Sequence, residues 1–353
     1  MKKKPSKTAK IFSLVGIFVF LVAAFFAVQH LLVPKYCIEL PEGGMVREYY
    51  KDARKDFDVI FVGDCEVYED YSPMVLWEDY GISSYIRGSS QQLIFQSYYM
   101  LEDTIRYEKP KVVVFSVRSL QYDYAWSEPY NRMTIEGMKW SSSKVNCIKA
   151  SMLEDENFVD YVFPILRYHT RWKEVNYEDF HYYFKPRQIT HNGYYMVLNV
   201  KPVENLPSVK PLADYTFPDR AWEYMDKMRT LCEDNGIELL LVKSASVYPH
   251  WYDEWDEQVE DYAKEHNLVY VNLLEHQDET RVNYETDTSD AGLHMNLYGA
   301  EKCSRYLGKV LKDNYDLKDR RDEEDLSQYW KEKRALYDEA IDEQIEILSL
   351  SEE

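Results

Sequence analysis

Residues 58–66 read Asp-Val-Ile-Phe-Val-Gly-Asp-Cys-Glu, and this stretch decides the fold. Its four consecutive apolar residues, two of them valine and one isoleucine, predict a strand buried on both faces, as a parallel sheet requires. The glycine and polar residues that follow predict a tight turn at the end of that strand. In parallel α/β sheets, functional residues gather at the carboxyl ends of strands, so this turn is the first place to look for a site.

Four more segments share this character. The five strand candidates are 58–62, 83–87, 112–117, 237–242 and 268–271. Helical patterns between them cover 93–107, 219–233, 254–265 and 299–311. The alternation predicts an α/β fold, a flavodoxin-like three-layer sandwich around a parallel five-stranded sheet in the order 2-1-3-4-5.

The N-terminus predicts a membrane anchor. Residues 11–33 contain no Asp, Glu, Lys or Arg, and five lysines precede them within 1–10. The run is long enough to cross a bilayer, is apolar on every face, and ends without the small residues of a signal-peptide cleavage site. Lysines on its N-terminal side predict a cytoplasmic tail at 1–10 and an extracytoplasmic domain at 34–317.

Two segments depart from the strand–helix alternation. Residues 122–218 are rich in Tyr, Trp and Arg, look helical over 131–156, and are expected to form an inserted cap. A packing buttress without a substrate role is the alternative. Residues 318–353 predict an acidic amphipathic C-terminal helix, either packed on the domain or free to bind a partner.

Composition excludes several classes of function. The 353-residue chain has a net charge of −20, which argues against nucleic acid as a partner. No phosphate-binding glycine loop and no HExxH zinc motif occur, so no metal and no cofactor are expected. The cysteines are too scattered for a zinc ribbon or a disulfide framework, and one disulfide with an undetermined pairing stays open. They are Cys37, Cys65, Cys147, Cys232 and Cys303.

Polar residues at the strand ends suggest acyl transfer. Gly63-Asp64-Cys65-Glu66 follows the first strand and Gly88-Ser-Ser-Gln91 the second. A late loop, 287–296, carries Asp290 and His294. A nucleophile at a turn, a glycine loop to bind an oxyanion, and an Asp/His pair are what acyl transfer needs.

With these blocks the chain resembles the SGNH/GDSL hydrolase superfamily over about 55–312. It is most similar to the membrane-anchored, extracytoplasmic branch, which includes proteins of teichoic-acid D-alanylation and of alginate-type polysaccharide acetylation. The most specific match is the late block, Asp290…His294-Met-Asn296, followed by Gly299-Ala-Glu-Lys302. The resemblance implies a hydrolase or acyltransferase for ester-linked acyl groups of a cell-envelope glycan or teichoic-type polymer.

The resemblance assigns roles to three residues. Cys65 stands where the family has its serine nucleophile, His294 is the base, and Asp290 orients the base. Each has a structural alternative: Cys65 as an inert residue of a degenerate site, Asp290 as a turn former, and His294 as a structural histidine. Asp290 also precedes His294 by four residues where the family has three, and Gly292 is expected to let the loop bulge.

The third family block, with its oxyanion-binding Asn, is missing, so the backbone amides of Cys65 and Gly88 are expected to bind the oxyanion. The expected set of substrate-binding residues is Gly88, Ser89, Gln91, Arg118, Lys243 and Asn296. Arg118 and Lys243 end strands three and four, and ion pairing with acidic residues is the alternative for both. These departures leave open a second function, a catalytically degenerate protein that binds a glycan or a membrane acyltransferase partner.

Overall fold

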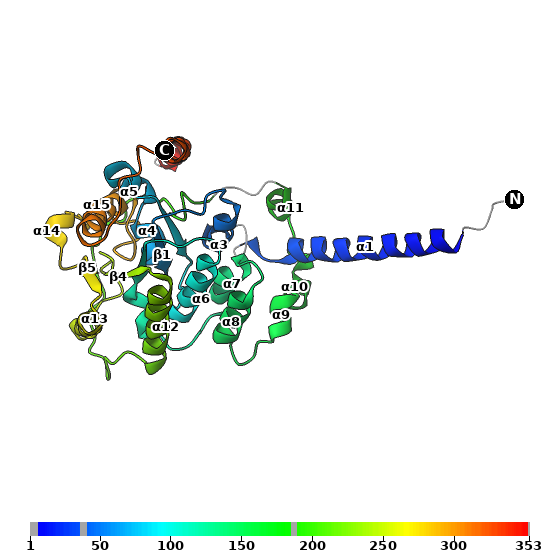
Figure 1. Cartoon of the computed structure of the whole chain (residues 1–353), viewed down its shortest axis with the longest axis horizontal. Coiled ribbons are helices and arrows are strands. Elements are labelled where there is room, and N and C mark those ends of the chain that lie inside the picture. The colour runs from blue at the N-terminus through cyan, green and yellow to red at the C-terminus, as the bar shows by residue number, and fades with distance from the viewer. Residues whose placement is uncertain (1–5, 36–40, 185–188, 352–353) are drawn as a thin grey trace.

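A computed structural model describes residues 6–35, 41–184 and 189–351, and its centre is an all-parallel sheet in the order β2-β1-β3-β4-β5 (Figure 1). The strands are β1 (Val59–Gly63), β2 (Ser84–Gly88), β3 (Val112–Ser116), β4 (Glu238–Lys243) and β5 (Val269–Asn272). The predicted strand order is confirmed, and every predicted strand end lies within one residue of the observed one. Gly63 stands opposite Gly88 in the register, so the loops after β1 and β2 begin at the same level.

Two helical layers cover the sheet because successive strand residues point to opposite faces. Phe61 and Val114 belong to one apolar core, and Val62 and Phe115 to the other. The first core is covered by α4 (Cys65–Asp70), α5 (Pro73–Tyr80), α15 (Leu297–Asn314) and α16 (Glu324–Ser351). The second is covered by α3 (Pro41–Lys51), α6 (Ile94–Ile105), α12 (Asp219–Asn235) and α13 (Asp253–His266). A short helix, α14 (Gln277–Thr280), precedes the late loop.

The described residues of 122–218 add no strand to the sheet. They include the helices α7 (Glu128–Gly137), α8 (Ser142–Ser151), α9 (Phe158–Val162), α10 (Ile165–Tyr168) and α11 (Tyr177–Phe184). Two 3-10 helices, η1 (Val117–Gln121) and η2 (His169–Lys173), lie before and within the segment. The helical character predicted over 131–156 is present as two helices: α7 ends at Gly137, and Ser141 caps α8 by accepting from Lys144 N at 3.2 Å.

The end of this segment belongs to the core. Tyr194, Met196 and Leu198 are buried against α4, α5 and α15, and Tyr195 N donates to Tyr68 O at 2.7 Å. Upstream, α7 packs on α3 and α8 packs on α6. The described part of 122–218 is therefore distributed between a flank of the domain and its interior.

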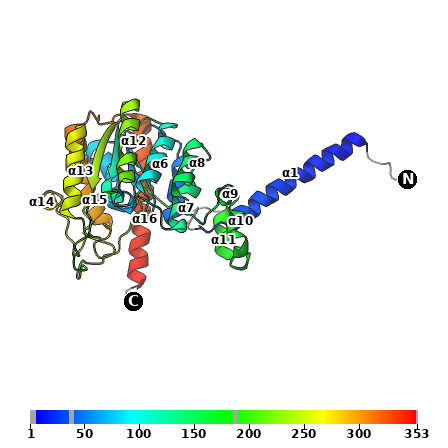
Figure 2. The same ribbon diagram turned by 90° about the horizontal axis from the view of Figure 1, so that it is seen from below.

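The C-terminal helix α16 packs on the domain along one face. Trp330 is buried and stacks on Trp77 at 5.5 Å between ring centroids, and the Tyr337 hydroxyl lies 3.2 Å from Ser72 Oγ. Farther along, Ile341 and Leu348 still pack against the core, whereas Ile347 and Leu350 are exposed. Figure 2 shows this end running out beyond the body.

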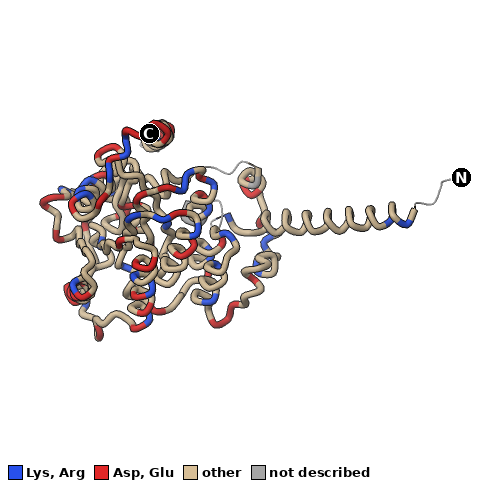
Figure 3. Tube along the Cα trace, viewed as in Figure 1, with Lys and Arg blue, Asp and Glu red and all other residues tan. Residues whose placement is uncertain are grey.

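The apolar run near the N-terminus forms one helix, α1 (Lys7–Leu32), which projects from the body (Figures 1 and 2). It is long and apolar enough to cross a membrane. Figure 3 shows it without charge along its length, apart from the lysines at its start. Its side chains are exposed until the last two turns, where they meet α10 and α11.

The cysteines of the described regions are free thiols. Cys65, Cys147, Cys232 and Cys303 are all buried, and no disulfide joins any two of them. Cys37 lies outside the described residues.

Candidate active site

Cys65 and His294 come together at the carboxyl edge of the sheet. Cys65 begins α4 directly after β1, and His294 lies in the loop before α15. The turn into α4 depends on Gly63, which has φ +154°, because a Cβ there would lie 2.9 Å from Ser116 Cβ. Asp64 then caps α4 by accepting from Glu66 N at 3.2 Å, which fixes the backbone that carries Cys65.

The late loop holds Asp290 against His294. Asp290 Oδ2 lies 2.6 Å from His294 Nδ1, and Oδ1 accepts from the His294 backbone N at 2.8 Å. The extra residue is accommodated by positive φ angles at Ala291 (67°) and Gly292 (96°), which turn the chain back between the two partners. Asp287, the other acid of this loop, binds Lys302 Nζ at 2.5 Å instead.

The other ring nitrogen of His294 is available to Cys65. The thiol and the imidazole are close enough that charge and hydrogen bonding between the two side chains shift both pKa values. Nε2 of His294 is buried and makes no regular hydrogen bond to any residue in the described parts of the chain. The contact with Cys65 is therefore a loose one, as is common in empty active sites.

Arg118 also lies beside the sulfur. It belongs to η1, after β3, and its Nη1 is 3.7 Å from Cys65 Sγ. The same guanidinium lies 3.7 Å from Asp64 and 3.8 Å from Glu66. This arginine is therefore ion-paired and also places positive charge beside the thiol.

Protonation in this site is set by burial and by the acids. Burial raises the pKa of the Cys65 thiol and the charge of Asp64 raises it further, whereas His294 and Arg118 lower it. Burial alone would lower the pKa of His294, but Cys65 charge and the Asp290 hydrogen bond raise it to about 12. Burial thus disfavours charge on both groups, whereas the thiolate and the imidazolium favour each other's charged form.

Lys243, which the sequence offered either as a substrate-binding residue or as an ion-pairing one, forms a buried ion pair. Its Nζ lies 2.9 Å from Glu66 Oε1, and both side chains are about 1% exposed. Glu66 also accepts from Ser246 Oγ at 2.6 Å and from Ser116 Oγ at 3.2 Å. Burial would raise the pKa of Glu66, but Lys243 and Arg118 hold it near 2. The pair braces the ends of β1, β3 and β4 beneath the site, so Lys243 does not face a substrate.

Asn296 is also a structural residue here. Its Oδ1 accepts from Tyr298 N at 3.1 Å and from Gly299 N at 3.2 Å, which caps α15. Its Nδ2 donates to Thr286 O at 2.8 Å. The side chain therefore binds the late loop to its own helix, and its polar atoms are occupied.

The loop after β2 lines a cavity on the Cys65 side. The cavity has a volume of about 260 Å³ and is bounded by Cys65, Gln91, Arg118, Tyr122 and Trp126, among others. Gln91 has φ +50° and accepts from Trp126 Nε1 at 3.1 Å, so the loop is held to the start of the 122–218 segment.

Gly88 and Ser89 are buried beneath this loop. A Cβ on Gly88 would lie 2.9 Å from Val67 Cγ2. A side chain there would push against α4, which carries Cys65.

Two acids that sequence reasoning missed also face His294. Glu69 Oε2 lies 3.5 Å from His294 Nδ1. Asp70 is fully buried, accepts from Met295 N at 2.8 Å, and binds the hydroxyl of Ser244. Asp70 thus joins α4 to the end of β4 and to the late loop. Their spacing from Cys65, four and five residues along a short helix, was the signal that could have indicated them.

A possible metal cluster lies elsewhere. Asp256, Glu260 and Glu275 can bring one oxygen each within 4.8 Å of one another. Asp256 Oδ1 already accepts from Trp251 Nε1 and Asn272 Nδ2, both at 3.0 Å. The cluster is explained by these contacts and does not adjoin Cys65.

No family model matches this chain, and no curated protein is similar enough in sequence to count as a match. Function is therefore inferred from the residues that meet at the edge of the sheet.

Proposed function

We propose that this protein is a membrane-anchored acyl-transfer enzyme of the SGNH type, with Cys65 as nucleophile. The observation that carries the proposal is the Asp290–His294 hydrogen bond of 2.6 Å next to the buried Cys65 thiol. An acid that orients an imidazole, and an imidazole beside a nucleophile, form the relay used in acyl transfer on unrelated folds.

The reaction would proceed in two steps. The Cys65 thiolate attacks the carbonyl carbon of an ester, a C–S bond forms, and the C–O bond to the leaving alcohol breaks. The charged His294, paired with the thiolate before the attack, gives its proton to the leaving oxygen and becomes neutral. Water or an acceptor hydroxyl then attacks the thioester, returns a proton to His294, and releases Cys65.

Arg118 and backbone amides would stabilise the developing oxyanion. Arg118 Nη1 lies 3.7 Å from the sulfur, and the amides of Cys65 and Gly88 lie at the same edge of the sheet. Gln91 lines the cavity beside Cys65 and would contact the acyl group, whereas Ser89 is fully buried.

The resemblance favours an ester-linked acyl group on a cell-envelope glycan or teichoic-type polymer as substrate. The helix α1 would hold the domain at the membrane surface, with the N-terminal lysines in the cytoplasm. No nucleic acid is expected as a partner, because the chain is strongly acidic.

A second function is favoured by the protonation of the site. The raised pKa of Cys65 and the occupied polar atoms of Lys243 and Asn296 fit a degenerate member of the family. Such a protein would bind a glycan or a membrane acyltransferase and would not catalyse acyl transfer.

Trapping of an acyl-enzyme distinguishes the enzymatic function from the binding function. The full-length protein in detergent is incubated with p-nitrophenyl acetate, and peptides are analysed by mass spectrometry. If the protein is an enzyme, we expect an acetyl group on Cys65 of the wild type. Cys65→Ala should then show no adduct and no activity, and Cys65→Ser should show weak activity. Cys147→Ala, a buried cysteine of α8, is the matched control and should change nothing. Turnover that is equal in Cys65→Ala and the wild type would refute the enzyme.

A further inference from the structure

A group of large apolar side chains is exposed beside the end of α1. Phe163, Leu166, Trp172, Tyr177 and Phe180 all lie within 18 residues, and we call them the 163–180 patch. Their exposed fractions run from 39% for Phe163 to 75% for Tyr177. Soluble domains rarely leave so many large apolar residues together in water, so the patch calls for a partner.

The patch is fixed to α1. The ring centroids of Phe25 and Phe163 are 6.2 Å apart. Arg171 Nη1 donates to Leu31 O at 3.4 Å and to Leu32 O at 3.3 Å, which satisfies carbonyls at the end of the helix. Figure 2 shows α9, α10 and α11 gathered around this end of α1, between the helix and the body.

The length of α1 places the patch at the depth of the lipid headgroups. A helix of 26 residues is about 39 Å long, whereas the hydrocarbon core of a bilayer is about 30 Å thick. If α1 spans that core, its last turns emerge into the headgroup region. Those are the turns that α10 and α11 contact.

Charge and residue type in this segment also fit a lipid surface. Residues 158–184 hold three Lys or Arg and four Asp or Glu, so they are nearly neutral in a chain of net charge −20. Lys173 Nζ lies 5.7 Å from the centroid of the Trp172 ring. Aromatic rings with basic neighbours are typical of the membrane–water interface.

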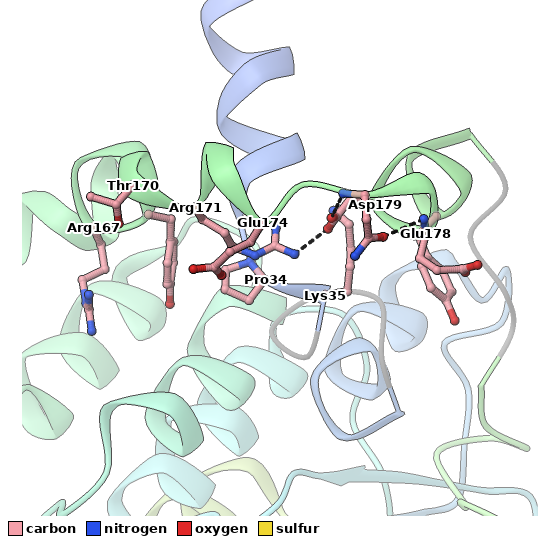
Figure 4. Close-up of a pocket in the computed structure, with 11 residues that line it drawn as sticks. Pro34, Lys35, Arg167, Thr170, Arg171, Glu174, Glu178 and Asp179 are labelled. Atoms are coloured by element: carbon pink, nitrogen blue, oxygen red, sulfur yellow. Dashed lines mark hydrogen bonds and ion pairs between the residues drawn. The ribbon is translucent and has the colours of Figure 1, made fainter.

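A cavity of about 530 Å³ opens beside the patch, between the end of α1 and α10–α11 (Figure 4). Its cations are already paired: Arg171 binds Asp179 at 2.6 Å, and Arg167 binds Glu128 at 2.8 Å. The cavity therefore offers little unpaired positive charge to a phosphate group. Contact with lipid is expected through the apolar side chains of the 163–180 patch.

We infer that the 163–180 patch inserts into the outer boundary of the bilayer around α1 and fixes the tilt of the domain on the membrane. The inference rests on the membrane anchoring proposed above. With the patch in lipid and α1 held by Arg171, the domain would sit in one orientation, and its active site would stay at a constant height above the surface.

Quenching by brominated lipid tests the inference. The full-length protein is reconstituted into phosphatidylcholine nanodiscs with plain or acyl-chain-brominated lipid, and tryptophan fluorescence is compared. α1 contains no Trp, so quenching reports only the rest of the chain. Trp172 is 66% exposed in the patch, and Trp140, 53% exposed outside it, is the control. We expect Trp172→Phe to remove most of the quenching and Trp140→Phe to leave it unchanged.

The outcomes separate the two proposals. Protein that copurifies with nanodiscs but is not quenched, or is quenched equally in Trp172→Phe, would overturn the interfacial patch and leave the anchor intact. Protein that does not copurify with nanodiscs would overturn both. Because Trp172 is exposed, Trp172→Phe should fold, and an unchanged circular dichroism spectrum checks this.

Discussion

Burial makes Cys65 a poorer nucleophile because it raises the pKa of the thiol, whereas the positive charges of His294 and Arg118 lower that pKa. The thiolate is the reactive form, and its fraction rises about tenfold per pH unit below the pKa. Because burial raises the pKa of Cys65, we expect slow alkylation by iodoacetamide at neutral pH and a steady rise above it. A preformed thiolate would instead give a rate that hardly changes between pH 6 and 9. The measurement is the rate of Cys65 modification, followed by mass spectrometry.

Two variants should move that rate in opposite directions. His294→Ala removes a positive charge that lowers the pKa of Cys65, so alkylation should slow at each pH. Asp64→Asn removes a negative charge that raises this pKa and keeps a helix-capping side chain, so alkylation should become faster. Equal alkylation rates in the two variants would contradict the inference that these charges shift the pKa of Cys65.

Asp70 should make stability depend on pH. Burial, and secondarily Glu66, raise its pKa to about 7 from 3.8, although His294 lowers it. The folded state therefore holds this proton more tightly than the unfolded state does. The contribution of Asp70 to stability is therefore full below about pH 4 and is lost as pH rises to about 7, by at most about 4 kcal/mol.

Asp70→Asn removes that titration while keeping an acceptor for Met295 N. The free energy of unfolding of the variant, minus that of the wild type, should rise between pH 5 and pH 8. Urea denaturation in detergent at both values measures it, and Asp70→Ala, which loses the contacts, should be weaker at both. A difference that does not change with pH would contradict the raised pKa.

At the scale of elements, α16 has a face packed on the domain and, toward its end, an exposed face. Trp330→Ala should lower the free energy of unfolding by about 3–5 kcal/mol, because it removes a buried ring stacked on Trp77. Ile347→Ala, on the same helix and 64% exposed, should change it by less than about 0.5 kcal/mol. Similar losses in both variants would mean that the end of α16 is covered in solution.

At the scale of the molecule, the proposed anchoring by α1 would determine where the domain works. The lysines within 1–10 predict that a phosphatase reporter fused after residue 353 is active only when exported. Replacing the five lysines within 1–10 by glutamine is the control and should weaken this orientation. Activity of a cytoplasm-specific reporter at the same place would reverse the topology and exclude an envelope polymer as substrate.

The sequence by itself determined the sheet, its strand order and the apolar helix. Runs such as 58–62 are apolar without a break, which only a doubly covered strand tolerates, and the charge-free run 11–33 needs no tertiary context to be recognised. It also placed Cys65, Asp290 and His294 at one edge, because strand ends in a parallel sheet meet there.

Only the tertiary structure decided what the other polar residues do and which charges they carry. Lys243 and Glu66 are 177 residues apart and form a buried ion pair, and the side-chain oxygen of Asn296 caps α15. The pKa values of Cys65 and Asp70 depend on complete burial, and the 163–180 patch is notable only because it lies beside α1. Such properties depend on distances between segments far apart in the chain, which a pattern of neighbours does not contain.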